Sequence, residues 1–374
     1  KEVSPIAVRY FFFCGNILWF SAFRLDLERP FNGKIRTYVN RFFITEGGCV
    51  VMLHKKVLKI SAIGVCLIAM NLTASAEGLY LPQHGLILDR QAQQQYIEKT
   101  AGDLFTGRNQ KPFVLPDGWQ RQDVTVSGIV VEKYTNTNSD SDKVLLQLHG
   151  GGYVLGMSDG HRLMALKQAA LMDAKEAYCV NYRLAPNYIY PAALDDAIAA
   201  YNYLLDSGIK AENIVLVGDS AGGNLAVALV LYLRDHQNAL PRLLVLQSPW
   251  TDFSTAAASR TYNDRKDKIL GRGTPLNKAV KEPSYAGTLS LSDPRLSLIH
   301  ADLKGLPPML IQTGGHEIFL TENQKFMEKA VDDGVEVTMT VYPDMPHDFA
   351  LCLPDLDASV ASLQEIGTFA KSHF

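Results

Sequence analysis

The 374-residue sequence has little of what several large classes of protein require. Its five cysteines include no C-x-x-C pair, which disfavours a zinc ribbon or a disulfide framework. It has no stripe of lysine and arginine, and its net charge is −3, so nothing indicates binding to nucleic acid. It also lacks the His-rich spacing of a metal site, internal repeats and low-complexity tracts. We therefore expect neither a metal nor any other cofactor.

Long hydrophobic runs are lacking too, since the apolar run at 60–70 is too short to span a bilayer. Three lysines at 55–59 precede this run, and Ala74-Ser75-Ala76 follows it as a fitting cleavage site. This pattern predicts a signal peptide over 52–76. We expect a periplasmic or secreted protein with no stable membrane insertion after cleavage.

Residues 1–51 would then lie upstream of the native start, as a non-native or mis-annotated segment. A membrane segment at 10–23 is a weaker alternative, because about 14 residues do not cross a bilayer. Cleavage after Ala76 would leave only Cys179 and Cys352. Cys179 lies in a strand-like run and is expected to be a packed free thiol, so no disulfide is implied.

What the sequence does contain is ample apolar material, 47% of all residues, for one large domain over 77–374. Strand-like runs occur near 123–134, 143–148, 177–182, 213–217, 242–247, 308–312 and 336–342. After the first run they alternate with helical stretches near 161–172, 192–206, 221–234, 322–333 and 355–371. This alternation predicts an α/β fold with a mostly parallel sheet and helices on both faces. The remaining segments, about 77–120 and about 253–291, are expected to form a small cap.

Two glycine-rich motifs stand about 70 residues apart, H-G-G-G-Y at 149–153 and G-D-S-A-G-G at 218–223. The second has the G-x-S-x-G form of a nucleophile elbow, between an apolar strand-like run at 213–217 and a helix. A sharp turn there would expose the hydroxyl of Ser220, with the N–H of Ala221 at the helix N-terminus as an oxyanion donor. The alternative is a tight turn in which Ser220 only caps the helix.

A serine nucleophile needs a base, which follows it in the chain order Ser, acid, His. Among the later histidines, His347 is the best candidate because it follows a strand-like run at 336–342. The acid is expected after the preceding strand, where T-G-G-H-E offers Glu317. Asp344 competes, but a carboxylate three residues from His347 on one loop rarely supports the imidazole from behind. Asp332 and Asp333 lie at the end of a helix that is predicted to start at the capping box T-E-N-Q at 321–324, and both are expected to be solvated.

Together these blocks resemble the hormone-sensitive-lipase-like, or GDXG, branch of the α/β-hydrolase esterases and lipases. The resemblance runs from about Lys143 to the C-terminus through N-Y-R-L-A-P at 181–186, S-P-W-T-D at 248–252, D-P-R-L-S at 293–297 and M-P-H-D-F at 345–349. It implies oxyanion donors at Gly151, Gly152 and Ala221, with His149 and Gly150 shaping the loop. Most members carry aspartate where this chain has Glu317. A subset that includes acetyl-hydrolase-like members resembles it in using glutamate.

The resemblance implies a serine hydrolase that cleaves short-to-medium carboxylic esters through an acyl-enzyme on Ser220. A lactone hydrolase or acetyl hydrolase of the same fold is one alternative. A ligand-binding homologue without catalysis is another, which the intact His347 argues against. The expected partner is a small-molecule ester, and the sequence leaves a homodimer open.

Overall fold

The computed structural model describes residues 79–108 and 112–374 and, before these, the backbone of five strands. Those strands are β1 (Ala7–Cys14), β2 (Ile17–Arg24), β3 (Tyr38–Thr45), β4 (Gly48–Leu53) and β5 (Lys56–Ile60). They extend one edge of the sheet, where β1 pairs in parallel with β13. Strands β4 and β5 overlap the start of the predicted signal peptide. Residues 61–76 lie outside the described residues, so the cleavage of this segment stays a prediction.

The sheet that carries the main domain is mostly parallel, as predicted. Its strands are β6 (Trp119–Val126), β7 (Ile129–Asn136), β8 (Val144–Leu148), β9 (Glu176–Val180), β10 (Ile214–Asp219), β11 (Leu243–Gln247), β12 (Met309–Gly314) and β13 (Val337–Tyr342). They lie in the order β13-β12-β11-β10-β8-β9-β7-β6. All neighbouring strands from β13 to β9 pair in parallel, whereas β7 pairs antiparallel with both β9 and β6.

The first predicted strand, at 123–134, is wrong in one respect, because it is two strands. A turn at Ser127 and Gly128 reverses the chain between β6 and β7, and both residues have positive φ, 49° and 89°. A two-residue turn with positive φ at both positions matches the twist of a β-hairpin. The apolar residues on either side concealed this turn in the sequence.

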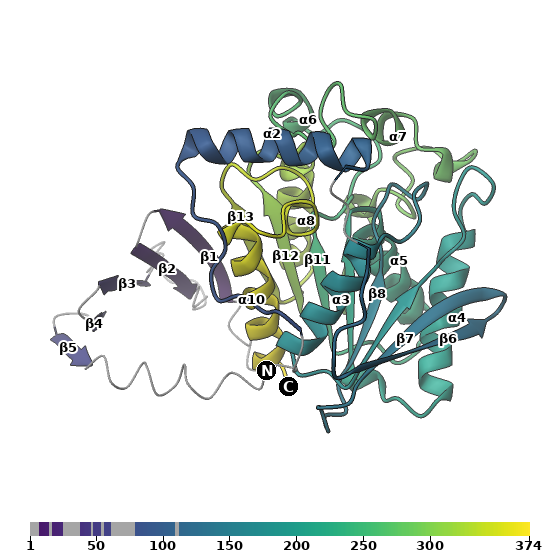
Figure 1. Cartoon of the computed structure of the whole chain (residues 1–374), viewed down its shortest axis with the longest axis horizontal. Coiled ribbons are helices and arrows are strands. Elements are labelled where there is room, and N and C mark those ends of the chain that lie inside the picture. The colour runs from purple at the N-terminus through teal and green to yellow at the C-terminus, as the bar shows by residue number, and fades with distance from the viewer. Residues whose placement is uncertain are drawn as a thin grey trace, which may run out of the picture.

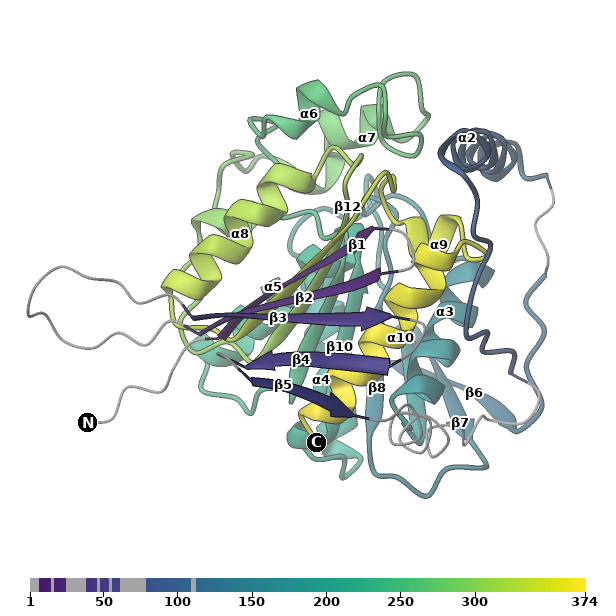
Figure 2. The same cartoon turned by 90° about the vertical axis from the view of Figure 1, so that its left-hand side faces the viewer.

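Helices cover both faces of the sheet, as predicted (Figures 1 and 2). One face carries α3 (Asp159–Leu171) and α10 (Asp357–Ser372); the other carries α4 (Ala192–Asp206), α5 (Ser220–Asp235) and α8 (Leu320–Asp332). Successive side chains of a strand point to opposite faces of the sheet, so Leu145 lies in the core under α3 while Leu146 lies in the core under α5. Burial on both sides explains the continuous apolar runs of these strands.

The expected capping box at 321–324 does not form. Helix α8 begins at Leu320, before the residues of the predicted box, and Phe319 precedes it without a side-chain cap. Thr321 instead contacts the Ser259 hydroxyl at 2.8 Å, and Glu322 turns inward to Arg260. Tertiary partners thus compete successfully for the side chains that would have capped the helix.

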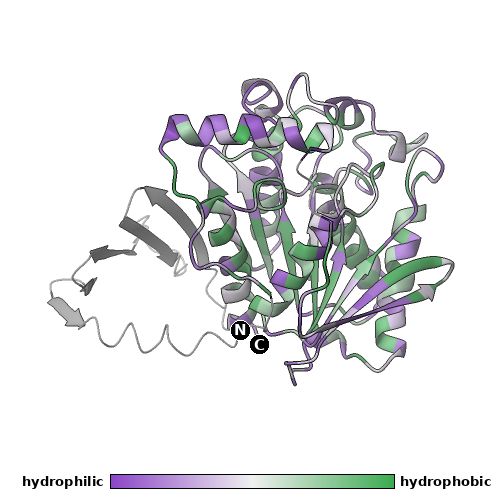
Figure 3. Cartoon of the chain, viewed as in Figure 1, coloured by the Kyte–Doolittle hydropathy of each residue, from purple (hydrophilic) through white to green (hydrophobic). Residues whose placement is uncertain are grey.

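The remaining elements lie above the carboxyl ends of the parallel strands (Figure 1). They are α2 (Arg90–Thr106), α6 (Ser259–Tyr262), α7 (Asn277–Lys281), α9 (Phe349–Cys352) and the short turns η2 (Ser284–Ala286) and η3 (Leu298–His300); η1 (Ala211–Asn213) precedes β10. Helix α2 buries only Ile97 and Ala101. Its surface is mostly hydrophilic, unlike the strands below it (Figure 3). No helix in the described part of the chain is long and apolar enough to cross a membrane.

Candidate active site

Ser220 lies at a sharp corner between β10 and α5, with a φ of 50°. The corner is tight because backbones cross directly beside it. A Cβ at Gly218 would come within 2.3 Å of the Gly222 oxygen, and a Cβ at Gly222 within 2.0 Å of the Leu148 oxygen. Only glycine fits such approaches. The G-x-S-x-G spacing is therefore required by the packing of β10, α5 and β8 around the serine.

Loops after β12 and β13 bring Glu317 and His347 to the same edge of the sheet. The Ser220 Oγ lies 2.9 Å from the His347 Nε2. On the other side of the ring, the His347 Nδ1 lies 3.3 Å from the Glu317 Oε2. The latter two atoms lie within ion-pair distance but do not form a hydrogen bond. All three side chains are buried, which strengthens their electrostatic interaction.

The electrostatics of the three residues follow from burial and mutual contact. Burial raises the pKa of Glu317 to about 7, although contacts with His347 and Ser248 oppose the shift. Burial disfavours a charged His347, but neighbouring carboxylates outweigh it and hold the pKa of this imidazole well above its ordinary value. A histidine flanked in this way is a strong base that is well stabilised once it has taken up a proton.

The loop 149–152 lies beside this corner with a backbone that favours glycine, since φ is 114° at Gly151 and 61° at Gly152. The Gly150 N–H donates to the Asp219 carboxylate at 3.0 Å, which ties the loop to the residue before Ser220. Burial lowers the pKa of His149 to about 4, so this ring is neutral. It stacks on Tyr182 at 4.2 Å between ring centres. His149 thus packs within the loop and makes no contact with Ser220 in the described structure.

Residues 145–351, more than half of the chain, match the family described as the alpha/beta hydrolase fold. The chain belongs to this family. An acetyl-hydrolase from Streptomyces hygroscopicus is 35% identical over 255 residues, 67% of this chain and 82% of that protein. An esterase from Acinetobacter venetianus is 32% identical over 253 residues, 68% of this chain and 82% of the relative.

A solved esterase of the bacterial hormone-sensitive lipase family superposes with a TM-score of 0.69 at 30% identity, covering 76% of this chain and 99% of its own. The protein is thus a hormone-sensitive-lipase-like alpha/beta hydrolase, and its relatives are esterases. The resemblance seen in the sequence motifs is confirmed.

Asp348 is a residue of this hydrolase that the sequence reasoning missed. Its Oδ2 lies 3.1 Å from the His347 Nε2, the same nitrogen that contacts Ser220. Its other oxygen is buried without a hydrogen bond, and its backbone has a φ of 47°. Burial raises the pKa of Asp348 to about 6 while His347 lowers it. The left-handed backbone turns this carboxylate back toward the histidine, which adjacency in the sequence did not reveal.

Asp267 is a second residue that the sequence did not single out. Its buried carboxylate accepts from the N–H groups of Ile318 at 2.9 Å and His347 at 3.4 Å. It also accepts from Ile269 and Leu270 on its own loop. One carboxylate therefore joins the cap segment to both loops that carry Glu317 and His347.

The competing acids of the sequence lie elsewhere. Asp344 contacts His316 at 3.0 Å and Arg90 at 3.6 Å, and its carboxylate makes no contact with His347 in the described structure. Asp333 pairs with Lys329 at 2.9 Å, and Asp332 is exposed.

Trp250 is fully buried against Phe253, so it packs in the core. In the described residues no group of three or more His, Cys, Asp or Glu side chains is arranged to hold a metal.

Proposed function

We propose that this carboxylic-ester hydrolase works through an acyl-enzyme on Ser220, with His347 as the general base and Glu317 as the acid. The observation that carries this proposal is the continuous line of contacts from the Ser220 Oγ through the two His347 nitrogens to the Glu317 carboxylate. A serine hydroxyl is a weak nucleophile at its own pKa, and such a line supplies the base that activates it.

In the first half of the proposed reaction, the Ser220 Oγ attacks the ester carbonyl carbon while its proton passes to the His347 Nε2. The tetrahedral intermediate collapses, the C–O bond to the alcohol breaks, and His347 returns the proton to the departing oxygen. Glu317 holds the ring and stabilises its positive charge. Water then attacks the acyl-serine by the same proton route, and the products are the acid and the free serine.

The negative oxygen of the intermediate is assigned to the N–H groups of Gly151, Gly152 and Ala221. Ala221 is in the first turn of α5, where backbone N–H groups have no partner within the helix. The positive φ values of the two glycines support the proposal, because they set the backbone of the loop beside the serine. Loss of one such donor lowers kcat by about 10²–10³-fold.

We propose short acyl groups for the ester. An acetyl-hydrolase and an ethyl acetate hydrolase are among the relatives, at 35% and 32% identity. Tyr153, the residue after Gly152, belongs to a group of buried aromatic rings that leaves little room for a long acyl chain beside it. Tyr153 stacks on Tyr285 at 3.8 Å, and Trp250 stacks on Phe253 at 3.9 Å. A panel of p-nitrophenyl esters tests this idea; a kcat/KM that rises steadily beyond a butyryl chain would contradict it.

Replacement of the nucleophile tests the mechanism. We expect Ser220→Ala to abolish turnover of p-nitrophenyl acetate and to prevent labelling by a fluorophosphonate. The matched control is Ser284→Ala, an exposed serine of the cap, which should keep full turnover and labelling. A folded Ser220→Ala protein that retains most of its activity would refute the mechanism. Failure of the folded wild-type protein to react would favour a ligand-binding homologue instead.

We also propose that residues 52–76 direct export and are removed. The support is the sequence pattern of lysines, apolar run and Ala74-Ser75-Ala76. Cys179 and Cys352, the cysteines beyond this segment, are both free, so folding needs no disulfide there. N-terminal sequencing of protein from a periplasmic fraction should begin at Glu77; a start before residue 52 would contradict the proposal.

A further inference from the structure

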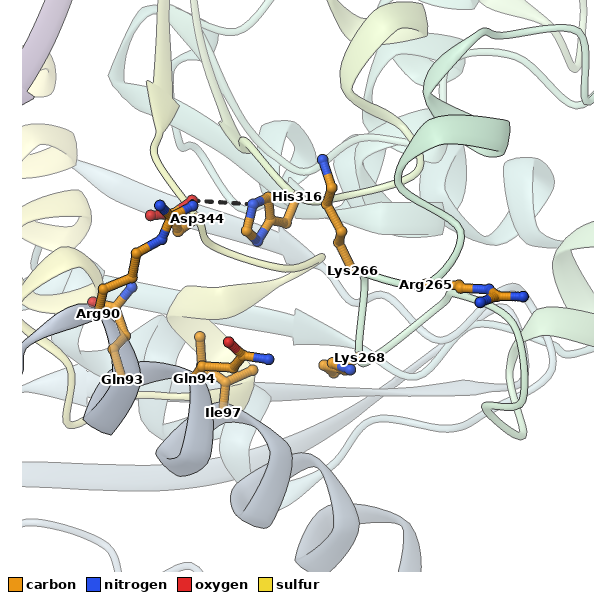
Figure 4. A pocket seen from close by; sticks show the side chains of 9 residues that line it. All are labelled: Arg90, Gln93, Gln94, Ile97, Arg265, Lys266, Lys268, His316 and Asp344. Carbon is orange, nitrogen blue, oxygen red and sulfur yellow. Dashed lines mark ion pairs between the residues drawn. The ribbon is translucent and has the colours of Figure 1, made fainter.

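A cationic cavity of about 250 Å³ lies between α2 and the loops that carry the proposed triad. Its walls come from three directions (Figure 4). Helix α2 contributes Arg90, Gln93, Gln94 and Ile97; the cap segment contributes Arg265, Lys266 and Lys268; and the loops after β12 and β13 contribute His316 and Asp344. Ser220 and the oxyanion glycines are not part of this lining. The reaction proposed above therefore leaves this cavity without a role.

Positive charge exceeds negative charge in this cavity. Four cationic side chains line it with a single carboxylate, Asp344. Asp344 is shared between Arg90 at 3.6 Å and His316 at 3.0 Å. Lys268 is paired at 3.1 Å with Glu98. The cations are thus only partly neutralised by the described residues.

Lys266, on the wall opposite α2, is the least neutralised of the cations that face the cavity. Lys266 makes only a long contact with the Tyr262 ring, at 5.9 Å, and no ion pair with a described residue. Arg265 makes no ion pair there either, but its side chain points away from the rest in Figure 4. Burial lowers the pKa of His316; Asp344 opposes this shift, while Lys266 and Arg90 add to it, which places both cations close enough to act on the ring.

We propose that this cavity binds a small oxyanion, either a phosphate or the carboxylate of a small organic acid. Arg90 and Lys266 would hold the anion from opposite walls, since charge-assisted hydrogen bonds to an oxyanion are stronger than neutral ones. The amides of Gln93 and Gln94 supply further donors, and the buried Ile97 forms an apolar floor for the rest of an organic ligand.

The place of the cavity links such an anion to the active site. Lys266 and Lys268 line the cavity, while Asp267 between them turns inward and accepts from the N–H groups of Ile318 and His347. An anion that joins α2 to residues 266–268 therefore steadies the segment that holds both catalytic loops. The cavity is a binding site for an effector, or for the acid that the reaction itself releases.

The test uses the full protein after its active serine has been blocked by a phosphonate, so that anions cannot bind there. We expect inorganic phosphate, at constant ionic strength set with sodium chloride, to bind in a calorimetric titration and to raise Tm. Hydrogen exchange should slow at 90–97 and 264–270. A parallel titration with acetate distinguishes the two sources: binding of both anions indicates a carboxylate ligand, and binding of phosphate alone indicates a phosphate.

Two charge-matched double variants make the test specific. Arg90→Gln with Lys266→Gln removes a cation from each wall and should weaken phosphate binding by about tenfold or more. Lys99→Gln with Lys281→Gln removes two exposed cap cations outside the lining and should leave the binding unchanged. No binding of either anion, or equal loss in both double variants, would overturn the proposal. Failure of the proposed reaction would show as absence of phosphonate labelling, whereas absence of anion binding in labelled protein would count against this cavity alone.

Discussion

The carboxyl edge of the sheet and the cap above it are built on opposite principles. At the edge, Ser220, Glu317 and His347 are each at most 5% exposed and are fixed by strands buried on both faces. In the cap, the 17-residue α2 buries only Ile97 and Ala101. A rigid edge holds the proposed catalytic residues in place, whereas the sparsely packed α2 can change its surface at little cost to the fold.

The two regions are joined by buried polar contacts as well as by apolar packing, since Ile269, Leu270 and Tyr285 of the cap belong to the main core. Arg260 of α6 pairs at 2.9 Å with Glu322 of α8, and Asp267 contacts both catalytic loops. Buried polar contacts require specific partners in specific positions, so they define how the cap is placed on the edge.

The largest effect is expected at the edge, from Glu317→Gln. An amide cannot stabilise the charged imidazole, so kcat on p-nitrophenyl acetate should fall by about 10³–10⁴-fold. The matched control is Glu322→Gln, which alters an equally buried glutamate that pairs with Arg260 instead of His347. It should lower stability and leave kcat within a few-fold of wild type. A Glu317→Gln enzyme within tenfold of wild-type kcat would exclude Glu317 as the acid.

The next largest effect is expected from Arg260→Met, which breaks the buried pair that joins the cap to α8. Burial raises the pKa of Glu322, and Arg260 opposes that shift, so the arginine keeps a costly buried carboxylate paired. Its removal should lower the free energy of unfolding in urea by about 3 kcal/mol. Lys278→Met breaks an exposed pair with Glu282 and should cost less than about 1 kcal/mol. Equal losses of unfolding free energy in the two variants would show that the Arg260–Glu322 pair contributes no more than a surface contact.

A smaller effect should come from Asp348→Asn, measured as the pH dependence of kcat/KM. The base must be neutral to accept the serine proton, and the Asp348 carboxylate helps to hold the pKa of His347 high. Without that charge the pKa of His347 falls, so the acidic limb of the profile should move down by about 1–2 pH units. Asparagine also tolerates the left-handed backbone at this position.

The control for this shift lies four residues earlier on the same loop. Asp344 shares the left-handed backbone, with a φ of 59°, but contacts His316 and Arg90. Asp344→Asn should therefore leave the acidic limb in place. An unmoved limb in Asp348→Asn, or an equal move in both variants, would mean that Asp348 does not set the protonation of His347.

The smallest effect is expected in the cap, from Lys99→Ala on α2. Lys99 and Asp103 form an exposed i,i+4 pair at 3.3 Å. Such pairs are worth about 0.3–0.5 kcal/mol, so Tm and kcat should hardly change. A loss of stability comparable to that of Arg260→Met would show that α2 is packed more firmly than its exposure indicates.

Much of the fold and of the candidate site could be predicted from local sequence. The strand-like run at 213–217 and the helix after it place Ser220, and the run at 336–342 places His347, because parallel strands end at one edge of the sheet. The hairpin at Ser127 and Gly128 was missed, since its turn interrupts neither apolar run. The predicted capping role of Thr321 was wrong because Ser259, far away in the sequence, binds that side chain.

The sequence by itself determined which residues form the proposed reaction centre. The order of the proposed nucleophile, acid and base follows the order of the strands, and the glycines at 218 and 222 are required by backbone contacts within β10, α5 and β8. Only the tertiary structure decided what surrounds that centre. Asp348 faces His347 because of one left-handed residue, and Asp267 and the cationic cavity arise where α2, residues 264–270 and two loops meet. Such contacts depend on the packing of distant segments, which no local pattern encodes.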